Sequence, residues 1–175
     1  MPPVRVSLRP AADSDLEFLH RVYASTRTEE LAPVPWTPEQ KAAFLRSQSE
    51  MQHRHYRATR PDASYEIILC DGHPAGRLYV ARTKSEIRIM DIALLPEFRG
   101  RGIGTQLLKK LCDEGDAAGL LITIHVEQNN PALRLYERLG FRRVEENGPY
   151  FMLARQPIYQ KGQGSVPKIS THKCA

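Results

Sequence analysis

The stretch from Pro96 to Thr105 has the residue types and spacing of a phosphate-binding loop. Gly100, Gly102 and Gly104 alternate with Arg101 and Ile103. An apolar segment, 87–95, comes before them, and a helical pattern follows. Where a strand turns through glycines into a helix, backbone N–H groups lack partners and carry partial positive charge. Since glycine also lets a ligand approach the backbone, the stretch predicts a pyrophosphate site.

Two common glycine-rich loops do not fit this spacing. A nucleoside-triphosphate loop needs a lysine and a serine or threonine directly after its last glycine, whereas Thr105 and Gln106 follow Gly104 here. A dinucleotide-binding loop spaces its glycines G-x-G-x-x-G, and here the last gap is one residue short. The pattern therefore indicates a phosphate ligand other than these two.

A second motif spans residues 129–141 and reads as a short helix. Asn130 suits the N-cap, Pro131 the first helical position and Gly140 the C-terminal stop. The apolar residues of the segment recur at helical spacing, so that one face of the helix is predicted to be buried.

Together the two motifs resemble those of the GNAT N-acetyltransferase superfamily. Arg99-x-x-Gly102-x-Gly104 is similar to its acyl-CoA pyrophosphate loop, and Asn129-x-x-Ala132-x-x-Leu135-Tyr136-x-x-x-Gly140-Phe141 to its second signature. The resemblance extends, in order of elements, over about residues 4–155. It implies an α/β (α+β) fold with a mixed, mostly antiparallel, splayed sheet flanked by about four helices. It also implies an acetyl-CoA-dependent N-acetyltransferase.

The resemblance implies a set of residues for the acetyl-CoA site. The strand before the loop would bind the pantetheine arm through its backbone, and the loop would bind the pyrophosphate. Tyr136 would be the acid that protonates the leaving thiolate, since a tyrosine at this position lies near the thioester sulfur in the family; the alternative is a core aromatic residue on the apolar face of its helix. The expected cofactor contacts are Ile92, Ala93, Leu94, Arg99, Gly100, Arg101, Gly102, Ile103, Gly104, Thr105, Asn129 and Tyr136. For Arg99 and Arg101 the alternative is surface charge, with Arg99 turned onto an acidic partner.

The proton acceptor for the amine is one of two carboxylates, Asp91 or Glu86. The family resemblance allows an acidic residue at either position. They are five residues apart, so they point to opposite faces of a regular strand, unless a bulge changes the parity. Asp91 stands in the most apolar part of the strand, where it must be either functional or paired with an arginine. This surrounding favours Asp91, with Glu86 as the alternative.

Other polar and aromatic residues have less specific patterns. His125, on an apolar strand, is expected to be a core residue rather than a base. His53 and His55 do not share a helix face, and no metal site is predicted. Trp36, Tyr56 and Tyr79 could line an acceptor pocket or belong to the core.

These residues must be positioned by an alternation of strands and helices. Strands are predicted at 4–9, 65–70, 75–81, 86–95, 120–126, 141–145 and 150–154. Helices are predicted from about 16, 37–57, 102–118 and 131–139, with Phe44, Met51 and His55 on one face of the second. Residues 156–175 have little apolar content and are expected to form a flexible tail after one domain, 1–155.

Composition limits the remaining possibilities. The chain has 175 residues, of which 41% are hydrophobic, enough for one core. Its three cysteines do not suggest a disulfide framework, and we expect a cytoplasmic protein without a membrane segment. The net charge of +5 is spread along the chain, which makes nucleic acid an unlikely partner.

The acceptor amine cannot be named from the sequence, and a homodimer is possible. Two alternatives to an acetyltransferase of small-molecule or protein amines stay open. One is a non-catalytic acyl-CoA-binding module, and the other a GNAT enzyme acting on aminoacyl-tRNA.

Overall fold

The computed structural model describes residues 2–159, so most of the predicted tail lies outside the described residues. The predicted order of strands and helices is confirmed. The elements are β1 (Val6–Pro10), α1 (Leu16–Leu31), α2 (Pro38–Thr59), β2 (Ser64–Cys70), β3 (His73–Arg82), β4 (Glu86–Leu94), α3 (Ile103–Ala118), β5 (Leu121–Glu127), α4 (Leu133–Arg138), β6 (Arg142–Asn147) and β7 (Tyr150–Arg155). Two short 3-10 helices, η1 (Asp13–Asp15) and η2 (Pro96–Phe98), precede α1 and the glycine-rich loop.

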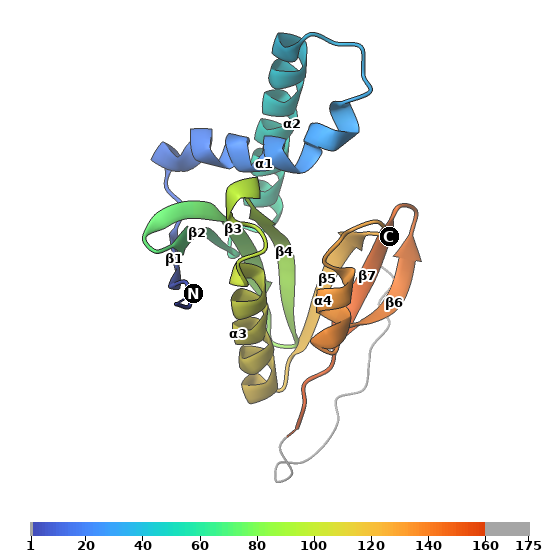
Figure 1. Ribbon diagram of the computed structural model, residues 1–175. Helices are drawn as coiled ribbons and strands as arrows, with labels where there is room; N and C mark the ends of the chain where they lie inside the picture. Colours follow the sequence, from blue (N-terminus) through green and yellow to red (C-terminus); the bar gives the residue numbers. More distant parts are fainter. Residues whose placement is uncertain (1, 160–175) are drawn as a thin grey trace.

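The strands form one seven-stranded sheet in the order β1-β2-β3-β4-β5-β7-β6. Only β4 and β5 pair in parallel, while every other neighbouring pair is antiparallel. The mixed, mostly antiparallel sheet predicted from the family resemblance is therefore confirmed. In Figure 1, β4 and β5 start together and then diverge, so that the sheet has two limbs, β1–β4 and β5–β7.

Helices cover both faces of the sheet. On one face, α3 buries Ile103, Leu107, Leu108 and Leu111 against strand residues such as Ile87 and Ile122, and α4 adds Tyr136. Burying each such side chain contributes roughly 1.5–3 kcal/mol. This cluster is the main core because it contains most of the buried apolar side chains. On the other face, Leu19 of α1 packs with Tyr65, Ile67 and Tyr79, and Tyr56 of α2 lies against them.

Helix α2 begins as predicted but exposes the face on which its apolar residues lie. Thr37 accepts a hydrogen bond from the N–H of Gln40, whose side chain accepts one from the N–H of Thr37. Phe44 and Met51 are exposed, Met51 by 54%, whereas the buried residue of the helix is Ser49. The inner face of α2 lies against α1 and is polar there: the hydroxyl of Ser49 lies 2.7 Å from Nδ1 of His20. Figure 1 shows α2 projecting beyond the sheet.

Candidate active site

The two central strands separate partway along their length. The β4–β5 ladder runs from Glu86–Leu121 to Ile89–Ile124 and stops there. Strand β4 continues to Leu94 paired only with β3, and β5 continues to Glu127 paired only with β7. The backbone of β4 from Met90 to Leu94 therefore has no strand on its β5 side. We call this opening the fork. The predicted pantetheine positions, Ile92, Ala93 and Leu94, lie in it.

A bulge in β4 lies at the start of the fork. Tyr79 of β3 is opposite Asp91, but the next residue, Val80, is opposite Ile89, which leaves Met90 as an extra residue. Ile89 and Ile92 both pack toward the α3 core, while Met90 packs in the cluster on the other face. The bulge therefore places Asp91 on the same face as Glu86. The expectation that they point to opposite faces holds only for a regular strand.

The bulged strand also approaches β3 closely. A Cβ atom at Gly76 of β3 would lie 2.1 Å from the carbonyl oxygen of Ala93. Only glycine fits at this position without displacing β4, because the clash is with backbone atoms. Gly76 thus fixes the strand that forms one side of the fork.

The glycine-rich loop presents a row of unpartnered N–H groups. Within the described residues, the backbone N–H groups from Gly100 to Thr105 donate to no backbone acceptor, and the first bond of this region is from Gln106 to the carbonyl of Gly102, at 3.0 Å. Gly100 and Gly102 have φ of 73° and 76°. A Cβ atom at Gly100, Gly102 or Gly104 would meet no atom within 4 Å, so the space in front of the loop is open. This arrangement fits a pyrophosphate bound at the N-terminus of α3.

The two arginines of the loop are exposed. Arg99 donates from Nε to the carbonyl of Leu94 at 2.9 Å, and does not turn onto an acidic partner. The guanidinium of Arg101 lies 5.4 Å from the centre of the Phe98 ring. Arg99 is therefore directed to the last residue of β4, where the fork meets the loop.

Tyr136 lies on α4, on the other side of the fork. Its side chain is 3% exposed and meets Phe141 edge to face at 5.5 Å. Burial, and to a lesser degree the charge of Asp91, raise the pKa of the Tyr136 hydroxyl well above its usual value. The phenol thus stays protonated at neutral pH.

The turn before α4 differs in detail from its prediction. The helix begins at Leu133, two residues after Pro131, and Asn130 accepts a hydrogen bond from the N–H of Ala132 at 2.8 Å. Asn130 therefore organises the turn, as its capping role predicts, although the regular helix starts later. Asn129 is exposed beside it.

Both carboxylates of β4 have cationic partners. Asp91 pairs with Arg77 of β3, whose side chain is buried. Glu86 accepts hydrogen bonds from the hydroxyl of Thr123 and from Nε of Arg88, the latter at 3.1 Å. The sequence predicts that Asp91 is either functional or paired with an arginine, and in the structure it is paired with Arg77.

His125 was predicted to be a core residue, and this is wrong. It is exposed because it alternates with the buried Ile124 and Val126 and so faces away from α3. Its Nδ1 lies 3.2 Å from Nη1 of Arg88. Partial desolvation of the ring by its neighbours and the nearby Arg88 lower the pKa of His125, which is therefore neutral at pH 7.

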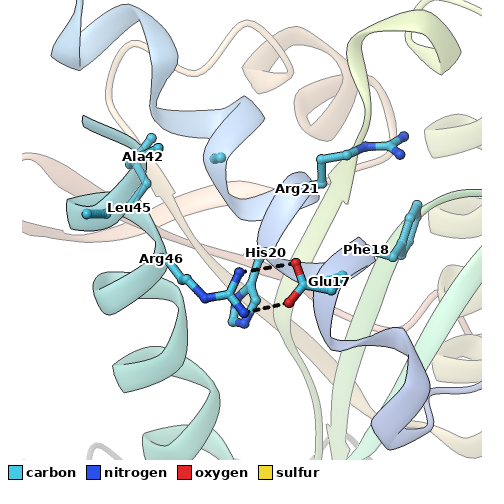
Figure 2. A pocket seen from close by; sticks show the side chains of 9 residues that line it. Glu17, Phe18, His20, Arg21, Ala42, Leu45 and Arg46 are labelled. Atoms are coloured by element: carbon cyan, nitrogen blue, oxygen red, sulfur yellow. Dashed lines mark hydrogen bonds and ion pairs between the residues drawn. The ribbon is translucent and has the colours of Figure 1, made fainter. Parts of the chain in front are cut away.

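A separate groove of about 520 Å³ lies between α1 and α2. Figure 2 shows Glu17 and Arg46 paired across it, with Phe18, Ala42 and Leu45 along its walls. From α1 the groove is lined by Glu17, Phe18, His20, Arg21 and Ala24, whereas Leu19 packs on the sheet. None of the predicted site residues lines it.

Between residues 2 and 159, no group of three or more His, Cys, Asp or Glu side chains is arranged to hold a metal ion. In the same part of the chain, no helix is long and apolar enough to cross a membrane.

Comparisons with known proteins agree with this geometry. A family model described as "Acetyltransferase (GNAT) family" matches residues 20–141. An N-alpha-acetyltransferase RimI of Mycobacterium tuberculosis is 31% identical over 126 residues, which cover 71% of this chain and 73% of the relative. A spermidine N(1)-acetyltransferase of Escherichia coli is 26% identical over 168 residues, with 89% and 86% covered.

Solved structures show the same fold. The PaiA N-acetyltransferase of Thermoplasma acidophilum, in complex with coenzyme A, superposes with a TM-score of 0.64 at 17% identity, and covers 87% of this chain and 99% of that one. The ribosomal-protein-S18-alanine N-acetyltransferase of Escherichia coli superposes with a TM-score of 0.60 at 18% identity, with 93% and 99% covered. The chain therefore belongs to the GNAT acetyltransferase family, and it transfers an acetyl group from acetyl-CoA to an amine.

Proposed function

We propose that the acceptor is the free α-amino group of a peptide or protein, and that the acetyl group passes to it directly in the fork. The observation that carries this choice is the charge balance on the face of the sheet that α1 and α2 cover. Three carboxylates that β4 and β5 carry on this face are each paired with an arginine. The pairs are Asp91 with Arg77, Glu86 with Arg88, and Glu127 with Arg27.

This balance favours an acceptor with one positive charge over a polyamine. A polyamine carries several ammonium groups, and binding them needs carboxylates that are not already neutralised. A peptide N-terminus brings one amine and an otherwise neutral backbone. The relative that acts on ribosomal protein S18 alanine, by its name, uses such an amine, while the spermidine relative does not.

Direct transfer is supported by where the cysteines lie. Within the described residues, Cys70 and Cys112 are both buried in the α3 core, away from the face that α1 covers. An acyl-enzyme route needs an accessible nucleophile. In direct transfer the amine nitrogen forms a bond to the thioester carbonyl carbon, and the carbon–sulfur bond breaks.

Tyr136 and Glu86 are proposed to handle the two protons. The buried, protonated phenol of Tyr136 donates its proton to the departing thiolate. The side chain of Glu86 is 28% exposed. It accepts the proton that the amine loses, through solvent on the face of the sheet that α1 and α2 cover. Asp91 is less suited to this role, since a proton on it would leave the buried charge of Arg77 without a partner.

The fork and the loop are proposed to hold acetyl-CoA with the residues predicted from the sequence. Ile92, Ala93 and Leu94 offer backbone groups to the pantetheine arm. The N–H groups from Gly100 to Thr105 bind the pyrophosphate, with Arg99 and Arg101 adding positive charge. Asn129, exposed at the turn before α4, is the remaining candidate contact.

An acceptor panel tests the proposal. Release of the CoA thiol is measured with acetyl-CoA and three acceptors: a peptide with a free N-terminus, the same peptide N-terminally blocked but carrying a lysine, and spermidine. We expect kcat/KM for the free N-terminus to exceed the other two by about tenfold or more, since the paired carboxylates disfavour the polyamine.

Three results would contradict the proposal. One is spermidine as the best acceptor. Another is thermal stabilisation by acetyl-CoA without thiol release from any amine, which would indicate a non-catalytic module. The third is acetyl transfer confined to aminoacyl-tRNA and lost steeply with salt.

A further inference from the structure

Arg77 is the most deeply buried charged group near the fork, and the proton transfers above do not use it. It lies in the middle of β3 and is 4% exposed. Its guanidinium lies 5.1 Å from the centre of the Tyr79 ring and 5.9 Å from that of Tyr23. Burying a guanidinium is costly unless its partners compensate the charge and the N–H groups. The role of Arg77 is therefore to be found in the groups that its guanidinium binds.

Arg77 holds the residue that follows the bulge of β4. From Nη2 it pairs with Asp91, and from the same nitrogen it donates to Oε1 of Gln52, on α2, at 2.9 Å. The main chain at Ala93 lies opposite Arg77, so the side chain reaches back along the sheet to Asp91. One guanidinium thus links β3, β4 and α2.

The extra residue of the bulge is held from α2 as well. The hydroxyl of Tyr56 donates to the carbonyl of Met90 at 3.4 Å. Met90 and Asp91 are therefore both connected to α2, Met90 by Tyr56 and Asp91 through Arg77 and Gln52. These contacts lie where β4 leaves β5, next to the backbone that is proposed to bind the pantetheine arm.

The arrangement leaves one buried polar group of Arg77 unsatisfied. Nε of Arg77 is buried without a hydrogen-bond partner within the described residues. Replacing a buried ion pair by apolar residues of similar size is often neutral or stabilising. An ion pair with an orphaned N–H group at the bulge is thus better explained by positioning than by stability.

We propose that Arg77 is a positioning residue for the acetyl transfer: by holding Asp91 it fixes the bulge, and so fixes the backbone of Ile92 to Leu94 against the thioester. Gln52 and Tyr56 anchor the same point on α2. Asp91 then serves as the partner of Arg77 and not as the proton acceptor. The kinetic test of this inference rests on the proposed function, whereas its structural test, by hydrogen exchange, does not depend on that function.

The kinetic test compares Arg77→Lys with Asp91→Asn. Lysine keeps the charge but cannot hold Asp91 and Gln52 in the same planar geometry, so kcat should fall by about tenfold to a hundredfold. Asparagine still accepts a hydrogen bond from Arg77 but leaves its buried charge without a counterion, so kcat should fall by about as much as in Arg77→Lys and no further. Loss of about a hundredfold or more in Asp91→Asn with a mild effect of Arg77→Lys would identify Asp91 as the base and overturn the proposal.

The pH profile separates the two roles further. The titratable groups that interact electrostatically with Asp91 or Arg77 are Tyr79 on β3, Tyr56 and His53 on α2, Tyr23 on α1 and Tyr136 on α4. Burial raises the pKa of Tyr56 to about 12 and also raises that of Tyr79 and Tyr136. In Asp91→Asn, kcat should fall at low pH at the same pH as in the parent protein, because a positioning residue is not the group that accepts the proton. If this fall at low pH disappears in the variant, the result contradicts a positioning role.

Two further measurements keep the proposal testable if a single variant folds poorly or the acceptor is wrong. The double variant Arg77→Met with Asp91→Leu removes both charges, and should fold but transfer acetyl slowly; full activity would overturn the proposal. In Arg77→Lys without ligand, amides of residues 89–94 should exchange with deuterium faster than in the parent protein. Unchanged exchange there would refute the proposal, whether or not the acceptor panel succeeds.

Discussion

At the scale of single residues, Tyr136 carries the sharpest prediction. Tyr136→Phe should lower kcat by about tenfold to a hundredfold, because it removes the proton donor but keeps the ring against Phe141. The KM for acetyl-CoA should change by no more than about twofold. Steady-state kinetics of thiol release measures both, and the melting temperature serves as the control for folding. Unchanged turnover would remove Tyr136 from the mechanism.

The residue scale also shows what the sequence could not predict. Glycine and asparagine spacing indicated the loop and the turn before α4, because those features are local. The common face of Asp91 and Glu86 depends on a one-residue bulge between β3 and β4, which no spacing within β4 reveals. Arg77 was missed for a similar reason, since its partners Asp91 and Gln52 come from other elements.

At the scale of elements, the N-terminus of α3 can be tested with a single carboxylate. Gly104 is in the first turn, and a Cβ there meets no atom within 4 Å. Gly104→Asp should keep or raise helix stability, by about 0.3–1 kcal/mol, because a negative charge suits a helix N-terminus. It should nevertheless weaken CoA binding by about a hundredfold or more, since it fills the pyrophosphate site with like charge.

The matched control for this variant is Gly148→Asp in the β6–β7 turn. A Cβ there also meets no atom within 4 Å, and aspartate tolerates its φ of 56°. Calorimetric titration with CoA and thermal melts measure both effects. If Gly104→Asp binds CoA as tightly as Gly148→Asp, the loop is not the pyrophosphate site.

The junction of β1 and α1 gives a prediction about pH. Asp15 accepts two hydrogen bonds from Arg9 and one from the N–H of Ala12, each at 2.8 Å. The bonds from Arg9, more than that from Ala12, lower the pKa of Asp15 to about 2. Because the folded pKa lies below the unfolded one, the stabilisation is full above about pH 4 and is lost as pH falls toward 2.

Asp15→Asn should therefore cost about 1–2 kcal/mol at pH 7, where Arg9 is partly exposed and the pair is partly screened. The difference from the parent protein should fall steeply as pH approaches 2 and vanish below it, as measured by urea unfolding across this range. Glu17→Gln, which removes an exposed pair with Arg46, is the control and should show no measurable change. A difference that is undiminished at pH 2 would mean that the carboxylate charge is not the cause.

The start of a helix could be predicted where the sequence contains capping residues. The face of a helix that becomes buried was harder to predict. Thr37 and Gln40 mark the start of α2 through their own hydrogen bonds, which the sequence pattern contains. The exposed side of α2 could not be read from the same pattern. Phe44 and Met51 share a face, but which face the sheet covers depends on α1 and on polar partners such as His20.

At the scale of the whole molecule, the fork results from the strand order. Strand β5 pairs with β7 in antiparallel from Ile122 to Glu127, while β4 pairs with β3. The two limbs follow different partners after Ile89 and Ile124, and so they diverge. The sequence alone does not contain this long-range pairing, which entered the prediction only through the family resemblance. The domain limit at residue 155 and the tail after it stay predictions.

The geometry of the whole site leads to a final prediction, made with hydrogen exchange. The fork and the loop are adjacent because β4 leads through η2 into α3. Bound CoA should therefore slow the exchange of amides 90–94 and 100–106 together, while β2 and β6 stay unchanged. At a hundred times its Kd, it should add about 2.7 kcal/mol to the free energy of unfolding.

A fragment of the ligand separates the two parts of the site. Adenosine 3′,5′-bisphosphate lacks the pantetheine arm, and so it has nothing to place in the fork. If the arm binds along β4, the fragment should protect neither 90–94 nor the bulge at Met90, and any protection it gives should be confined to the loop and the start of α3. Equal protection of 90–94 by CoA and by the fragment would mean that β4 responds indirectly. The backbone of Ile92 to Leu94 would then not be the surface that positions the thioester.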